Sequence, residues 1–195
     1  MENFQVNLEH VINKTFEILR NNSSESRIVF PIYRNQSRRV CEQELRFVFV
    51  EQLQKLLEEY DMFYSVETPT HDKYKFSHKG KYIKPQIFEN GQSASFDLSI
   101  IDKKGNTIAI IEFKAKMASK HEYAKDICKL WNPNEKSFYK YFLNLFEKIE
   151  KGTKESLKDK LIPGKNEWLL EKKSSEKIIV MAQSLENDSK IREEI

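Results

Sequence analysis

An α/β fold, with a mixed central β-sheet flanked by helices, is the fold class that the sequence predicts. Residues 38–60 carry apolar side chains on one broad face, as an amphipathic helix does. Residues 96–116 read as two apolar strands around a Lys-Lys-Gly-Asn turn. Residues 176–184 have the unbroken apolar core typical of a strand buried on both faces. Because helices and strands both precede and follow the turn, we expect helices to cover the faces of one sheet.

The N-terminal third is predicted to supply two helices. Residues 3–20 place apolar side chains at the spacing of an amphipathic helix, which the polar stretch 21–26 ends. Residues 27–33 form a short extended piece, and Pro31 limits it to an edge or a loop. The helix over 38–60 is apolar nearly all round in its N-terminal half, so we expect it to be buried on several sides.

The remaining elements are predicted to complete one domain, 1–195, because no internal repeat or linker interrupts the chain. We expect its core at about 38–131 and 176–184, with a helical insertion at about 132–175. The predicted elements after residue 60 are a strand at 62–68, a loop or ragged hairpin at 69–81, the two strands of 96–116, helices at 119–131 and 136–150, a Lys-rich stretch at 151–177, the strand at 176–184 and a loose polar tail at 187–195.

Composition indicates a globular protein without a membrane span. Hydrophobic residues make up 39% and charged residues 32% of the chain, and no apolar run approaches the roughly 20 residues of a transmembrane helix. The N-terminal segment carries Glu2 and Glu9 and lacks the cleavage site of a signal peptide. Cys41 and Cys128 lack zinc-binding spacing and are expected to be reduced thiols, so the sequence favours a cytoplasmic protein.

Basic residues are concentrated in three stretches, although the net charge is only +3. Arg34, Arg38 and Arg39 lie close together, and lysines are dense in residues 71–84 and 114–129. Basic patches beside an acidic site would favour a polyanionic substrate. The alternative is that these lysines only solvate the surface of a Lys-rich chain.

Two carboxylates and an ammonium lie within the apolar strands of residues 96–116. If the chain reverses in the Lys-Lys-Gly-Asn turn, Asp97 faces Glu112, and Lys114 lies two residues further along the same face. Opposed carboxylates repel, and burying them costs on the order of several kcal/mol each unless a cation compensates. Oxygen ligands select a hard divalent ion, Mg²⁺ or Mn²⁺. Such an ion would polarise a phosphoryl group, and Lys114 could orient water or stabilise developing charge.

The segment Asp97, fourteen intervening residues and Glu112-Phe113-Lys114 resembles the signature of the PD-(D/E)XK nuclease superfamily, which has the restriction-endonuclease-like fold. The resemblance covers residues 38–131 and assigns the next core strand to residues 178–183. One departure is Phe96, which stands where the name-giving proline of the family would be.

The resemblance implies a single nuclease domain that hydrolyses phosphodiester bonds as an Mg²⁺- or Mn²⁺-dependent endonuclease. Asp97 and Glu112 would hold the metal, with the Phe113 carbonyl as a further ligand, and Lys114 would position the attacking water. DNA is implied as the commoner partner, with RNA left open and no membrane involved, in a defence, repair or mobile-element role. The oligomeric state stays open, a homodimer included.

An upstream helix in this family commonly contributes another glutamate, and Glu42 and Glu44 both fit that description. On a helical wheel, Glu42 falls on the face that carries Leu45 and Phe49, which is aimed at the core. Glu44 falls on the other side of the same buried half, so the geometry leans slightly to Glu42. For at least one of them, the favoured interpretation is an acid that complements the helix dipole.

Two alternatives compete with an active nuclease. The first is a catalytically inactive module of the same fold that binds nucleic acid or a protein partner. The second is a structural α/β domain in which Glu112 and Lys114 line a solvated face and neutralise each other. On the helix after the motif, Lys125, Asp126 and Lys129 could face a phosphate backbone, but a solvated helix face is the favoured interpretation.

Overall fold

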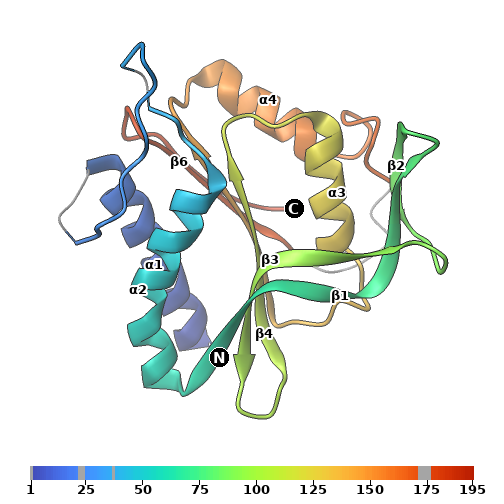
Figure 1. Cartoon of the computed structure of the whole chain (residues 1–195), viewed down its shortest axis with the longest axis horizontal. Helices are drawn as coiled ribbons and strands as arrows, with labels where there is room; N and C mark the ends of the chain where they lie inside the picture. The colour runs from blue at the N-terminus through green and yellow to red at the C-terminus, as the bar shows by residue number, and fades with distance from the viewer. Residues whose placement is uncertain (1, 22–24, 37, 171–176) are drawn as a thin grey trace.

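A seven-stranded sheet with helices on both faces forms the framework of the computed structural model, which describes residues 2–21, 25–36, 38–170 and 177–195 (Figure 1). The strands lie in the order β2-β1-β3-β4-β5-β6-β7. The strands are β1 (Met62–His78), β2 (Lys81–Ile87), β3 (Gln92–Asp102), β4 (Thr107–Ala115), β5 (Tyr139–Phe146), β6 (Ile179–Ser184) and β7 (Lys190–Glu194). The helices are α1 (Glu2–Asn21), α2 (Glu42–Tyr60), α3 (Lys120–Leu130) and α4 (Lys151–Leu161).

The sheet is mixed, as the sequence predicts. β4 pairs with β5 and β5 with β6 in parallel, whereas the other neighbouring strands pair in antiparallel fashion. Parallel neighbours require a crossover connection, and α3 and α4 are the helices in these two crossovers. As a result, α3 follows directly on the β3–β4 hairpin.

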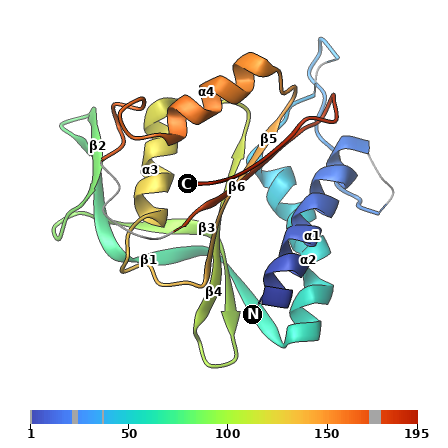
Figure 2. The same cartoon turned by 180° about the vertical axis from the view of Figure 1, so that it is seen from behind.

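Helices cover both faces of the sheet (Figure 2), and a hydrophobic cluster under each pair holds them in place. α1 and α2 pack on one face, where they contact alternate residues of the central strands such as Ile111 and Leu143. α3 and α4 pack on the other face, where they contact the intervening residues such as Ile110 and Phe142. The alternation of side chains along each strand therefore decides which helix pair a residue meets.

The predicted helices at 3–20, 38–60 and 119–131 are confirmed as α1, α2 and α3. The predicted extended piece at 27–33 contributes only an isolated bridge between Ile32 and Arg38. Residues 22–24 of the predicted break and residues 171–176, which include the end of the Lys-rich stretch and the start of the last predicted strand, lie outside the described residues.

The predicted register of the hairpin is also observed. Leu98 pairs with Ile111, Ser99 with Ile110 and Ile100 with Ala109, so the next pair along the strands is Asp97 with Glu112. The register shifts by one residue next to the turn. There Asp102 accepts hydrogen bonds from the backbone N–H groups of Lys104 and Asn106. The register shift is therefore confined to the end of the hairpin and does not reach Asp97 or Glu112.

The helix predicted at 136–150 is wrong, because residues 139–146 form strand β5 in the interior of the sheet. Apolar residues at helical spacing suggested the helix, but the run is buried almost throughout, which also suits a strand covered on both faces. Residues 132–175 are thus not a purely helical insertion, since they supply β5 as well as α4. The next strand after α3 is likewise β5 and not residues 178–183.

Two further expectations need correction at the edges of the sheet. The tail at 187–195 is not loose, because residues 190–194 pair with β6 as strand β7. The strand predicted at 62–68 extends to His78 and forms, with β2, the ragged hairpin predicted at 69–81. Pro69 is tolerated within it because the pairing of β1 with β3 shifts register directly after this residue.

None of the helices in the described ranges combines the length and the apolar character that crossing a membrane would require.

Candidate functional site

The β3–β4 hairpin directs Asp97 and Glu112 to the face of the sheet that α3 covers. Ile110 packs in the α3 cluster, and Glu112 lies two residues further along the same face of β4. An Asp97 carboxylate oxygen, Oδ2, accepts a hydrogen bond of 2.8 Å from the backbone N–H of Phe113. The carboxylate of Asp97 is therefore fixed against the strand that carries Glu112.

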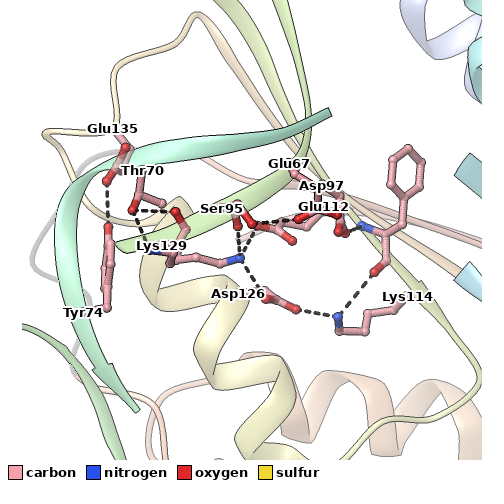
Figure 3. Close-up of polar contacts among 12 residues, drawn as sticks. Glu67, Thr70, Tyr74, Ser95, Asp97, Glu112, Lys114, Asp126, Lys129 and Glu135 are labelled. Carbon is pink, nitrogen blue, oxygen red and sulfur yellow. Dashed lines mark hydrogen bonds and ion pairs between the residues drawn. The ribbon is translucent and has the colours of Figure 1, made fainter. Parts of the chain in front are cut away.

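Helix α3 adds two charged side chains to these carboxylates (Figure 3). The Nζ atom of Lys129 lies 2.5 Å from Oε1 of Glu112 and 3.2 Å from Oδ1 of Asp126. It also donates a hydrogen bond of 2.8 Å to the carbonyl oxygen of Ser95 on β3. Lys129 thus joins α3 to both strands of the hairpin, and the interpretation of Asp126 and Lys129 as solvated residues is wrong.

Lys114 reaches the same group of charges from β4. Its Nζ atom lies 2.8 Å from Oδ2 of Asp126 and donates a hydrogen bond of 3.4 Å to the carbonyl oxygen of Phe113. Asp126 therefore lies between the two ammonium groups, with one carboxylate oxygen toward each. Lys114 and Lys129 retain only 14% and 8% of their side-chain exposure, so solvent screens these contacts weakly.

The start of α3 explains how its side chains come to face the hairpin. Ser119 and Glu122 form a capping box, in which each side chain accepts a hydrogen bond from the other residue's backbone N–H. Tyr123, Ile127 and Leu130 then pack against the sheet, and their helical spacing turns Asp126 and Lys129 inward as well. Lys125 points to another side, where its Nζ lies 5.1 Å from the ring centroid of Phe76.

Glu42 joins this group of charges, whereas Glu44 interacts elsewhere. Glu42 is the first residue of α2, and its Oε1 lies 3.6 Å from Nζ of Lys114. Glu44 instead contacts the Sγ of Cys41 and lies 3.6 Å from a guanidinium nitrogen of Arg39. The structure therefore brings together Asp97, Glu112, Lys114 and Glu42 of the sequence-predicted residues, and leaves Glu44 outside.

The pKa values of the two most deeply buried carboxyl groups, those of Glu112 and Asp126, shift in opposite directions. Burial raises the pKa of Glu112 well above its usual range, although Lys129 opposes that effect. Burial acts on Asp126 in the same direction, but Lys129 and Lys114 together hold its pKa below the usual value. The difference follows from geometry, because Asp126 has an ammonium on each side and Glu112 has one.

The pKa values of the two lysines and of Glu42 also depend on burial and on the charged groups around them. Burial alone would lower the pKa of Lys114 and of Lys129, yet the adjacent carboxylates raise both overall. Burial also raises the pKa of Glu42, against the pull of Lys114. Both lysines are therefore cations at neutral pH, and the site holds four carboxyl groups against two ammonium groups.

This arrangement differs from a solvated sheet face. The side chain of Glu112 is only 2% exposed, and its ionic partner is Lys129. Lys114 pairs with Asp126 and Glu42 and not with Glu112. The structural alternative, in which Glu112 and Lys114 neutralise each other in solvent, is not what the structure contains.

Asp126 and Lys129 were predicted to lie on a solvated helix face, although one signal in the sequence pointed to a buried position for Asp126. Asp126 lies within the Tyr123, Ile127 and Leu130 stripe of α3, where a solvated acid would be out of place. No comparable signal marks Lys129, because its long side chain reaches the site from the border of that stripe. Among the described residues, no group of three or more histidine, cysteine, aspartate or glutamate side chains is arranged to hold a metal ion.

Comparison of the chain with protein-family models, with curated proteins and with solved structures found no match.

Removing the charge of Asp126 is expected to destabilise the protein far more than removing that of Glu112. Asp126→Asn leaves Lys114 and Lys129 without the carboxylate between them, and breaking a buried ion pair typically costs about 3 to 5 kcal/mol. Glu112→Gln leaves Lys129 with Asp126 and the Ser95 carbonyl, and it removes a charge that burial disfavours. We therefore expect Glu112→Gln to change the free energy of unfolding by less than about 1 kcal/mol.

Urea denaturation at pH 7, where both carboxyls ionise when unfolded, measures both variants. Equal losses of stability would contradict the assignment of Asp126 as the shared partner of the two lysines.

Proposed function

We propose that the protein is a metal-dependent nuclease of the PD-(D/E)XK type, with a restriction-endonuclease-like fold, that hydrolyses phosphodiester bonds of nucleic acid. The observation that carries the proposal is the pair of half-buried Asp97 and buried Glu112 on adjacent strands, with Lys114 beside them. The order of α2, the β3–β4 hairpin and α3 agrees with the order that the resemblance implies. DNA is the favoured substrate because it is the commoner one in that superfamily.

The chemistry of the donors suits one Mg²⁺ or Mn²⁺ ion. Asp97, Glu112 and the Phe113 carbonyl offer only oxygen, which hard cations prefer. The Phe113 carbonyl is oriented toward the site, since Lys114 donates a hydrogen bond to it. When all four carboxyl groups are ionised, their excess of two charges over the ammonium groups equals the charge of one divalent ion. Burial of Glu112 adds to the fit, because its raised pKa reflects a negative charge that is short of compensation.

Each side chain then has a definable role in hydrolysis. A bound Mg²⁺ or Mn²⁺ would polarise the phosphoryl group and lower the pKa of a bound water. Lys114, oriented by Asp126 and Glu42, is placed to hold the attacking water or to stabilise negative charge on a phosphate oxygen. Lys129 opposes the effect of burial on Glu112 and holds its side chain in position, and Glu42 is a partly exposed carboxyl group.

The first test compares the wild type with Asp97→Ala. Wild-type protein is expected to nick supercoiled plasmid in Mg²⁺ or Mn²⁺ and to gain thermal stability from Mn²⁺, because a ligand that binds only the folded state stabilises it. Asp97→Ala is expected to lose both effects. Glu155→Ala, which removes an exposed carboxylate from α4, is the matched control and should behave as wild type. Identical behaviour of wild type and Asp97→Ala in both assays would refute the nuclease proposal.

The second test separates the two glutamates of α2. Glu42→Ala removes a partner of Lys114 and is expected to lower the rate of cleavage by about 10- to 100-fold, as loss of a residue that orients an essential group does. Glu44→Ala is expected to change the rate less than about threefold, because Glu44 contacts Cys41 and Arg39 outside the site. Cleavage rates at saturating Mg²⁺ give the comparison, and a larger effect of Glu44→Ala would reverse the assignment.

A catalytically inactive module that binds nucleic acid or protein is the second candidate, and Lys129 is the observation in its favour. Its ammonium already gives Glu112 a counter-ion within the protein, 2.5 Å away. A chain that had lost its metal would keep this ion pair for stability. Such a module would bind DNA with or without Mn²⁺ and would show no thermal stabilisation by the ion.

A further inference from the structure

Residues 73–87 of the β1–β2 hairpin carry a concentration of positive charge and no acidic residue of their own. Within the described residues, none of its five lysines pairs with a carboxylate, whereas lysines elsewhere, such as Lys14 and Lys165, do. The nearby Asp72 instead accepts hydrogen bonds from the side chains of Asn132 and Asn134. The five hairpin lysines are Lys73, Lys75, Lys79, Lys81 and Lys84.

Four of these lysines are exposed, and the fifth, Lys75, is half-buried with its Nζ 4.8 Å from the ring centroid of Phe88. Lys73 and Lys75 lie on the face of β1 opposite to Tyr74, which is completely buried. Lys79 and Lys81 flank the turn at Gly80, where the chain adopts a positive φ of 75°. The charge is therefore spread along the outer surface and the tip of the hairpin.

The hairpin is held in a fixed position against α3, the helix that supplies Asp126 and Lys129. The ring of Tyr82 stacks on that of His121, with 4.2 Å between the centroids. A ring nitrogen of His121 also lies 3.1 Å from the carbonyl oxygen of Ile83. Figure 1 shows β2 beside α3, at the edge of the sheet. The hairpin and the carboxylate site therefore share one supporting helix.

We propose that the β1–β2 hairpin is the arm through which this protein holds the phosphate backbone of its nucleic-acid substrate. The inference rests on the proposed nuclease function, because it assigns the hairpin to the substrate of that site. Five cations without carboxylate partners match a regularly spaced polyanion, and each phosphate contact gains free energy from counterion release. Tyr82, which is 69% exposed, adds an aromatic surface beside these cations of the kind on which bases stack.

Nucleic acid is favoured over an anionic membrane by the position of the arm. The same helix, α3, carries His121, which contacts the hairpin, and Asp126 and Lys129, which belong to the carboxylate site. A substrate with phosphodiester bonds spans both features, whereas a membrane surface would use only the lysines. A membrane partner is therefore an outcome that the experiment must be able to detect.

The test replaces the five hairpin lysines with glutamine in the full chain that also carries Asp97→Ala, so that cleavage does not interfere. Fluorescence anisotropy in EDTA measures binding of a labelled DNA duplex, and of one of its single strands, over a range of salt concentrations. The control carries the same Asp97→Ala change and the same number of lysine-to-glutamine changes at exposed positions outside the hairpin: Lys55, Lys103, Lys104, Lys177 and Lys190.

We expect the hairpin variant to bind at least one of the two DNA forms about tenfold more weakly at moderate salt. The slope of log affinity against log salt should fall by roughly 2 to 4, since each lost phosphate contact removes about 0.9 from it. The control variant should stay within about threefold of its parent, because its charges lie away from the site. Circular dichroism and thermal unfolding check that both variants are folded.

Equal weakening by both variants, or no weakening by the hairpin variant, would overturn the proposal. Loss of binding to phosphatidylserine vesicles without loss of DNA binding would overturn it in favour of a membrane partner. Because binding is measured without metal or cleavage, these outcomes are independent of the nicking assay. If the hairpin variant binds DNA more weakly than its Asp97→Ala parent but the wild type never cleaves DNA, the nuclease proposal is refuted. The arm then remains as a nucleic-acid-binding surface.

Discussion

The chain of ion pairs that joins the β3–β4 hairpin to α3 is the interaction on which the rest of the site depends. It runs from Glu112 through Lys129 and Asp126 to Lys114, with successive nitrogen–oxygen distances of 2.5, 3.2 and 2.8 Å. Burial makes isolated charges costly, so the two lysines require the shared carboxylate of Asp126. The same contacts hold α3 against the sheet and orient Lys114. When all four carboxyl groups are ionised, an excess of negative charge remains, which the proposed cation would compensate.

The hairpin and its register could be predicted because both depend on local sequence. The Lys-Lys-Gly-Asn turn sets where the chain reverses, and alternation then decides that Asp97 and Glu112 share a face. The conflict between apolar strands and opposed carboxylates marked these two residues as candidates for a functional site. Glu42 also emerged as the favoured α2 glutamate from the helical wheel, and it lies 3.6 Å from Lys114.

Features that depend on tertiary contacts escaped prediction. The run at 139–146 fits both the helical and the buried-strand pattern, and only its place between β4 and β6 makes it a strand. β7 is short and polar, and it forms because β6 offers a free edge to pair with. Lys129 looks like any surface lysine in the sequence, since its role depends on the approach of α3 to Glu112. Long-range packing decides all three cases.

The most direct measurement of the central claim is a crystal structure grown in Mn²⁺, with anomalous scattering used to find the ion. We expect one strong anomalous peak bound by the carboxylates of Asp97 and Glu112 and the carbonyl of Phe113, with Lys114 close by. Absence of a peak there at millimolar Mn²⁺, with Lys129 paired to Glu112, would contradict the proposed metal site. In that event the ion pairs alone would explain the buried carboxylates.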